Sequence, residues 1–65
     1  MRILVNGAWR ETAAPDLAAV LEELGLERSV VATALNGEFV PAASRAGAPV
    51  AEGDHLEVLA PMQGG

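Results

Sequence analysis

The stretch from Pro15 to Glu27 reads PDLAAVLEELGLE, and its apolar spacing decides how the rest of the chain must fold. Leucine or valine occupies positions 17, 20, 21 and 24, which is the i, i+3, i+4, i+7 spacing of one helical face. Asp16 is placed to cap the first turn, Gly25 fits the left-handed position that ends a helix, and Leu26 can supply the accompanying apolar contact. One helix cannot bury such a face alone, so the flanking segments must cover it.

The segments before and after this helix have the pattern of short strands. Residues 1–5 and about 8–12 flank Asn6-Gly7, a dipeptide typical of a type I′ hairpin turn, in which both central residues need a positive φ. Residues 30–35 and 38–40 flank a second such dipeptide, Asn36-Gly37, and Pro41 ends the later strand. The sequence therefore predicts one hairpin on each side of the helix.

The last part of the chain predicts a loop and one more strand. Residues 42–53, AASRAGAPVAEG, are expected to form a loop of small residues in which Val50 points inward. In the following HLEVLA, Leu56 and Val58 alternate with His55 and Glu57, so one face of this strand is buried and the other is wet.

Together these elements predict an α+β fold of the β-grasp, ubiquitin-like type. A mixed sheet of four or five strands packs on one main helix, in ββαββ order with one more short strand in the second half. The long connection allows the first and last strands to pair in parallel in the middle. The expected inner face holds Ile3, Val5, Leu56, Val58 and either Val30 or Val31. Both alternating sets of residues 30–35 are apolar, so that strand is either covered on both faces or carries an outer hydrophobic patch.

Composition limits the classes of function. Sixty-five residues make one domain at most, and the absence of cysteine excludes disulfides and Cys-based zinc sites. No apolar run approaches the ~20 residues of a membrane span and no signal sequence opens the chain, so a cytoplasmic protein without membrane association is expected. The net charge of -5 disfavours nucleic acid as a partner.

The chain shows no self-contained active site, so we expect that it is not an enzyme. It has two serines, Ser29 and Ser44, and a single histidine, His55, which we expect to be exposed and at most a partner contact. No phosphate loop or metal-ligand cluster is present in the sequence, so no cofactor is expected to bind. Glu22 and Glu23 are interpreted as a solvated helix surface. Trp9 is interpreted as packing across the first hairpin, with a contact to a partner as the alternative.

The closing residues 60–65, APMQGG, are poorly explained by packing. Glycines cost backbone entropy to order, so a flexible tail over 61–65 is expected beyond a domain of residues 1–60. Residues without a Cβ can thread a narrow channel, and five extended residues span at most about 17 Å. A carboxylate is ionised at neutral pH and is a poor acyl donor until it is activated with a phosphate-type leaving group. Once activated, it can accept an amine or a sulfur nucleophile.

Several of these segments resemble the ThiS family of sulfur carrier proteins in thiamine biosynthesis. The similar stretches are ILVNG at the start, ALNGEFVP in the middle and EGDHLEVLAPMQGG at the end, so the resemblance extends over nearly the whole chain. Many family members follow the VP with an arginine and, a few residues on, a tryptophan. This chain has Ala42, Ala43 and Ser44, with Arg45 displaced, so no role is transferred to residues 42–49.

The resemblance implies a mechanism and a set of partners. A ThiF-type adenylyltransferase would use ATP and magnesium to activate the Gly65 carboxylate, with Gly64 allowing the tail to thread. Sulfur from cysteine, delivered through a desulfurase, would convert the carboxylate to a thiocarboxylate, and a ThiG-type thiazole synthase would take the sulfur. The docking surface is expected on the exposed sheet face near the tail, with Leu59, Met62, Gln63 and Phe39 as candidate contacts.

Other functions remain open from the sequence. The same chemistry could serve molybdopterin synthesis or another sulfur-containing metabolite. Gly65 could instead form amide bonds, as in a ubiquitin-like protein modifier, or the glycines could be incidental to a plain interaction domain.

Overall fold

The structure, a computed structural model, describes residues 1–60, so the tail predicted for residues 61–65 lies outside the described residues. Within residues 1–60, five strands form one mixed sheet in the order β2-β1-β5-β3-β4. The elements in chain order are β1 (Arg2–Val5), β2 (Ala8–Glu11), α1 (Leu17–Glu23), β3 (Ala32–Leu35), β4 (Glu38–Val40), the 3₁₀ helix η1 (Ala42–Gly47) and β5 (His55–Leu59). The predicted β-grasp arrangement is confirmed.

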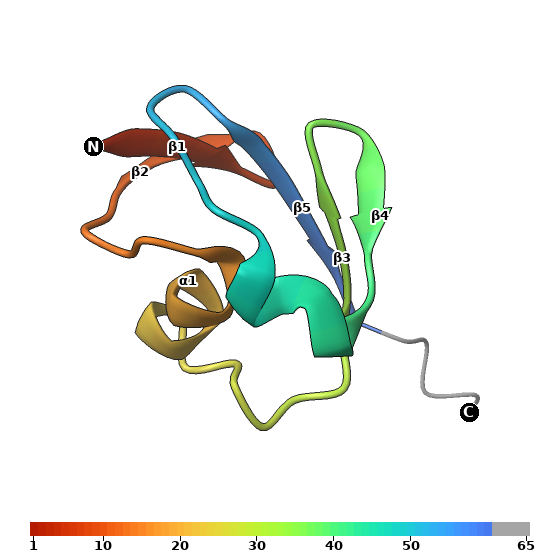
Figure 1. Cartoon of the computed structure of the whole chain (residues 1–65). Helices are drawn as coiled ribbons and strands as arrows, with labels where there is room; N and C mark the ends of the chain where they lie inside the picture. The colour runs from red at the N-terminus through yellow and green to blue at the C-terminus, as the bar shows by residue number, and fades with distance from the viewer. Residues whose placement is uncertain (61–65) are drawn as a thin grey trace.

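Strand β5 lies at the centre of the sheet, between β1 and β3 (Figure 1). It pairs with β1 in parallel, with Val5 opposite Leu56, and with β3 in the antiparallel sense, from Leu35 opposite Leu56 to Ala32 opposite Leu59. The predicted parallel pairing of the first and last strands is therefore confirmed. Helix α1 and η1 lie on one side of the sheet, which leaves the other side uncovered in the described chain (Figure 1).

Both ends of α1 have the caps that the sequence predicts. The Asp16 carboxylate accepts a hydrogen bond from the Ala19 backbone N–H at 2.9 Å, which satisfies one free donor of the first turn. At the other end Gly25 has a φ of 74°, and the Leu26 N–H donates to the Leu21 carbonyl at 2.8 Å. These contacts form a Schellman cap, which needs the left-handed backbone that glycine adopts without strain.

The core lies between α1 and the inner face of the sheet. The sheet contributes residues from β1 and β5, and the helix contributes the predicted apolar face. Its buried members are Ile3, Ala14, Leu17, Val20, Leu21, Val50, Leu56 and Val58. The inward position predicted for Val50 is therefore confirmed, and so is the burial of alternate residues along β5.

The strand predicted over residues 30–35 begins two residues later, at Ala32. Ala32 pairs with Leu59, the last residue of β5, so earlier residues have no β5 partner with which to continue the ladder. Val30 is 81% exposed, while Val31 packs partly buried against the core. Of the two valines left open by the sequence, Val31 therefore occupies the inner position.

Residues 42–47 form the 3₁₀ helix η1, so the expectation of a plain loop over 42–53 was wrong in its first half. The Arg45 guanidinium holds this segment against β3: Nε donates to the Thr33 hydroxyl at 3.1 Å and Nη2 donates to the Val31 carbonyl at 2.6 Å. Thr33 is itself buried and donates to the Val40 carbonyl. Apolar periodicity could not reveal this helix, because polar contacts from one arginine fix its position.

Candidate functional site

The end of β5 is the part of the described structure from which the Gly-Gly residues continue. Leu56 and Val58 point into the core, so His55, Glu57 and Leu59 point to the uncovered face of the sheet. Leu59 is 64% exposed. The other predicted site residues at this end, Met62, Gln63, Gly64 and Gly65, lie outside the described residues.

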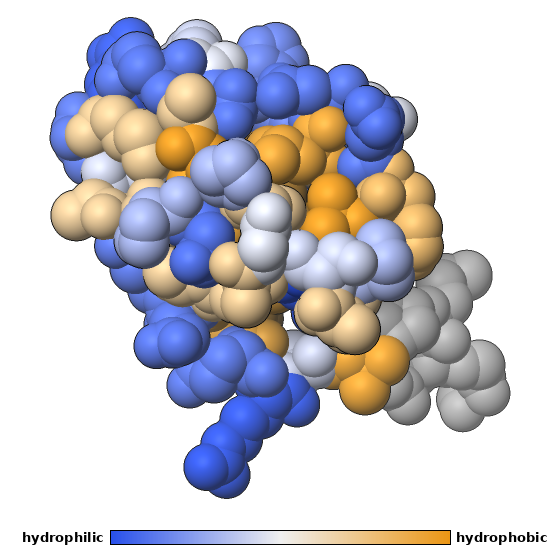
Figure 2. All heavy atoms as spheres, viewed as in Figure 1, coloured by the Kyte–Doolittle hydropathy of each residue, from blue (hydrophilic) through white to orange (hydrophobic). Residues whose placement is uncertain are grey.

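An apolar surface surrounds Leu59 on this face. The strand register places Ala32 opposite Leu59 and Ala34 opposite Phe39, and Phe39 is 69% exposed. These residues line one hollow with Glu57, and Val30 lines an adjoining hollow with Leu59. We call this surface the tail-side patch, and its members are Val30, Ala32, Ala34, Phe39 and Leu59. Figure 2 views the molecule with α1 and η1 in front, and on this side hydrophobic residues gather over the part where β3 and β4 lie in Figure 1.

The patch unites two residues that sequence reasoning selected with three that it did not. Leu59 and Phe39 were candidate partner contacts, and the structure brings them to one hollow. Val30, Ala32 and Ala34 were not selected as contacts, although the apolar character of both alternating sets in residues 30–35 indicated them. Of the two alternatives for that strand, the structure supports the outer hydrophobic patch.

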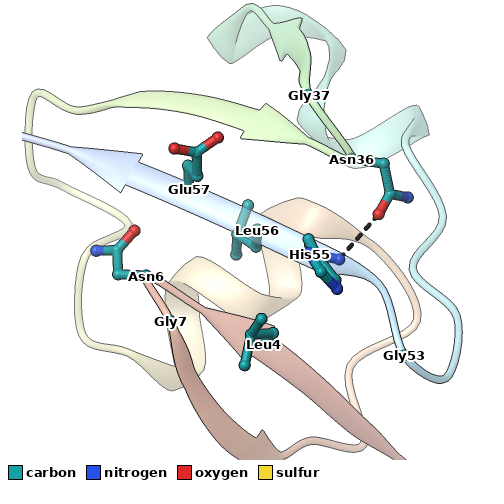
Figure 3. Close-up of a pocket in the computed structure, with 9 residues that line it drawn as sticks. All are labelled: Leu4, Asn6, Gly7, Asn36, Gly37, Gly53, His55, Leu56 and Glu57. Carbon is teal, nitrogen blue, oxygen red and sulfur yellow. Dashed lines mark hydrogen bonds between the residues drawn. The ribbon is translucent and has the colours of Figure 1, made fainter.

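The two Asn-Gly turns flank β5 and line a groove with His55 (Figure 3). Asn6 and Asn36 have φ values of 49° and 51°, as the predicted type I′ turns require. The Asn36 amide oxygen accepts from the His55 N–H at 2.9 Å, beside the start of β5. The Asn6 amide contacts Val58, nearer the end of β5: Oδ1 accepts from the Val58 N–H at 2.8 Å and Nδ2 donates to the Val58 carbonyl at 3.0 Å.

Trp9 lies on the same uncovered face, on the other side of β5 from Phe39. It pairs with Leu4 across the first hairpin, and the Arg2 guanidinium carbon stands 5.0 Å from the centre of its ring. The predicted packing across the hairpin is therefore confirmed. The ring is still 53% exposed, and His55 is exposed on the intervening strand, as expected.

The acidic residues of the described chain serve the fold or face solvent. Glu22 and Glu23 are exposed, as expected, and Glu23 also accepts a hydrogen bond from the Thr12 hydroxyl, which links the end of α1 to the end of the first hairpin. Within residues 1–60, no three or more His, Asp or Glu side chains are grouped so that they could hold a metal ion. In the same residues, no helix has both the length and the apolar character needed to cross a membrane.

Comparisons with known proteins identify the family. The ThiS family model matches residues 3–65. The sulfur carrier protein ThiS of Thermus thermophilus is 40% identical over 63 residues, which cover 97% of this chain and 98% of that protein. A crystal structure of the thiamine biosynthesis protein ThiS from Geobacter metallireducens superposes with a TM-score of 0.83 at 29% identity, over the full length of both chains.

A second relative contains a similar segment within a longer protein. The thiazole synthase of Paramagnetospirillum magneticum is 39% identical over 66 residues, which cover all of this chain but only 20% of that protein. Three findings lead to one conclusion: the family model matches through both terminal glycines, the Thermus carrier is similar over nearly its full length, and the Geobacter structure superposes over the whole chain. This chain belongs to the ThiS family of sulfur carrier proteins.

Proposed function

We propose that this chain carries sulfur as a thiocarboxylate on Gly65 and delivers it to a thiazole synthase in thiamine biosynthesis. The observation that carries the proposal is the family match over residues 3–65, which includes Gly64 and Gly65. The apolar tail-side patch supports it, because an exposed surface next to the reacting end is what a carrier needs for recognition by its enzymes.

The chemistry begins with activation of the carboxylate by a ThiF-type adenylyltransferase. A carboxylate oxygen of Gly65 attacks the α-phosphorus of ATP and pyrophosphate leaves, so the glycine becomes an acyl adenylate. A sulfide-equivalent nucleophile, derived from cysteine through a desulfurase, then attacks the acyl carbon. The C–O bond to AMP breaks, AMP leaves, and a thiocarboxylate remains. The partner binds the ATP and magnesium, and this chain contributes the substrate carboxylate and the surface by which it is recognised.

The tail-side patch would dock on the adenylyltransferase while the last residues enter its active site. Five extended residues span at most about 17 Å, so Gly65 can reach a buried site close to the docked patch. Phe39 and Leu59 are the largest apolar side chains of the patch, and each is more than half exposed. We expect Met62 and Gln63 to extend the contact along the channel, and Gly64 to pass where a side chain would not fit.

The proposed acceptor of the sulfur is a ThiG-type thiazole synthase. A segment similar to this whole chain occurs within a protein named thiazole synthase, which supports an association of this kind of chain with that enzyme. The carrier would not itself catalyse any of these steps, because its role is to present Gly65.

The intact mass of the protein tests the proposal. The chain is incubated with ATP, magnesium, its adenylyltransferase and a sulfide source, and a variant without Gly65 serves as the control. We expect a gain equal to the mass difference between sulfur and oxygen, and no gain in the control. An unchanged mass, with an adenylyltransferase shown to be active on another substrate, would refute the proposal, and covalent adducts to lysines of other proteins would favour a protein modifier.

A further inference from the structure

On the edge of β5 that faces β1, a side chain adds hydrogen bonds beyond those of the strand pairing. Along this edge the Leu4 N–H donates to the Asp54 carbonyl and the Asn6 N–H donates to the Leu56 carbonyl, both at 2.9 Å. The next carbonyl in this alternating series is that of Val58. Strand β1 ends at Val5, and the chain leaves β5 in the turn at Asn6-Gly7, so no further β1 backbone continues along this edge.

The side chain of Asn6 takes the place of the missing backbone. Its amide donates to the Val58 carbonyl and accepts from the Val58 N–H, at 3.0 and 2.8 Å. A carboxamide carries one acceptor and one donor group, as a peptide unit does, and so can extend a ladder by one step. Aspartate or glycine would also suit the first turn position, but neither offers both groups to Val58.

This contact lies directly before the residues that carry the chemistry. Val58 precedes Leu59 and Ala60, after which residues 61–65 continue to the reacting carboxylate. On its opposite edge, the end of β5 is held by β3 through the pairing of Leu59 with Ala32. Asn6 and Ala32 therefore hold the two edges of strand β5 just before the tail begins.

We infer that Asn6 is a positioning residue for the reaction of Gly65: its side-chain amide fixes the backbone at Val58 and thereby the place and direction in which the tail leaves the sheet. This inference rests on the proposed function. When an enzyme docks on the tail-side patch, the distance from the patch to Gly65 is set by the residues between them. A fixed starting point narrows the positions that the carboxylate samples, and reaction rates depend strongly on such placement.

Asn36 provides a matched control within the same fold. It also opens an Asn-Gly turn, with a φ of 51° against 49° for Asn6, and its Oδ1 also accepts a backbone N–H of β5. Its contact is with His55, at the start of the strand and away from the tail. The substitutions Asn6→Gly and Asn36→Gly keep a residue that tolerates a positive φ in each turn and remove the side-chain contacts.

The test compares adenylylation and thiocarboxylate formation in the wild type and in Asn6→Gly and Asn36→Gly. The kcat and KM for the carrier are measured with its adenylyltransferase, under conditions where circular dichroism shows each protein to be folded. We expect Asn6→Gly to lower kcat by about tenfold, because the Gly65 carboxylate is no longer held in place for reaction. KM should stay within about twofold of the wild type, because the tail-side patch that docks is intact. Asn36→Gly should leave kcat within about twofold of the wild type.

Amide hydrogen exchange supplies a readout independent of activity. In Asn6→Gly the amide of Val58 should lose protection more than amides at the start of β5, and in Asn36→Gly this order should be reversed. If Asn6→Gly is unfolded at the assay temperature, Asn6→Asp carries the test, since it keeps an acceptor for the Val58 N–H and replaces the donor to the Val58 carbonyl. We expect the same loss of kcat from it.

The outcomes separate the inference from the proposed function. If the wild type is not adenylylated by an active enzyme, the proposed function fails. If the wild type reacts and Asn6→Gly has the same kcat, or Asn36→Gly loses as much, the positioning role is refuted. A rise in KM alone would also refute it, because it would assign Asn6 to docking.

Discussion

Replacement of Phe39 by alanine should weaken docking on the adenylyltransferase and leave the fold intact. An aromatic side chain buries about 150–250 Å² when it is fully covered. Phe39 is 69% exposed, so about two thirds of that area, roughly 100–170 Å², is available to a partner. At ~25 cal/mol per Å² this corresponds to at most about 3–4 kcal/mol. Ordering costs at an interface reduce the gain, so we expect about 2 kcal/mol, or ~30-fold in affinity.

The assay is carrier-dependent release of pyrophosphate by the purified adenylyltransferase. Phe39→Ala should raise KM for the carrier by about 30-fold and leave kcat within about twofold, the pattern of lost uniform binding. Its melting temperature should fall little, because the side chain contributes little buried area to the fold. Trp9→Ala is the control, since Trp9 is 53% exposed on the same face but on the other side of β5. An unchanged KM for Phe39→Ala, or an equal rise for Trp9→Ala, would refute the assignment of docking to the tail-side patch.

Three further substitutions test the fold in urea unfolding experiments. Leu56→Ala should lower the free energy of unfolding by about 2–5 kcal/mol, because this side chain is 1% exposed at the centre of the sheet, and a loss below 1 kcal/mol would contradict its place in the core. Gly25→Ala should lower the free energy of unfolding by about 1–2 kcal/mol through the φ of 74° alone, since nothing lies within 4 Å of the added Cβ. Gly47→Ala is its control, because Gly47 also has nothing within 4 Å of an added Cβ but has no positive φ. Arg45→Ala should lower the free energy of unfolding by about 1–3 kcal/mol, because its hydrogen bonds to Thr33 and Val31 are lost, and should leave KM with the adenylyltransferase unchanged. A raised KM would instead make η1 part of the docking surface.

Local rules predicted the turns and caps because the residues that determine them are adjacent in the chain. Asp16 and Gly25 act on atoms a few positions away, and each Asn-Gly pair sets its own backbone. The start of β3 could not be predicted in this way. It depends on where β5 ends, through the pairing of Ala32 with Leu59, and the segment from 30 to 35 carries no local signal at that point.

In the candidate site too, features set by neighbouring residues could be predicted from the sequence, and contacts between distant residues could not. The exposure of Leu59 follows from alternation along its own strand, and Phe39 was selected as an apolar residue expected on the exposed sheet face near the tail. The second role of Asn6 could not be predicted, because turn preference already accounts for an asparagine there. Its contact with Val58 joins residues 52 positions apart and depends on the strand register.

The central pairing of β1 with β5 also constrains how this protein is made. A ribosome produces the first hairpin, the helix and the second hairpin before it reaches residue 55, and until then the two halves have no strand to join them. Closure of the sheet must therefore wait for β5, and such pairing between distant segments slows folding. Under the proposed function, an enzyme that docks on the folded outer face would therefore bind only chains translated through β5. A chain that terminates before residue 55 would lack β5, and with it Leu59 and the central pairing of the sheet, so it would not present the proposed docking face.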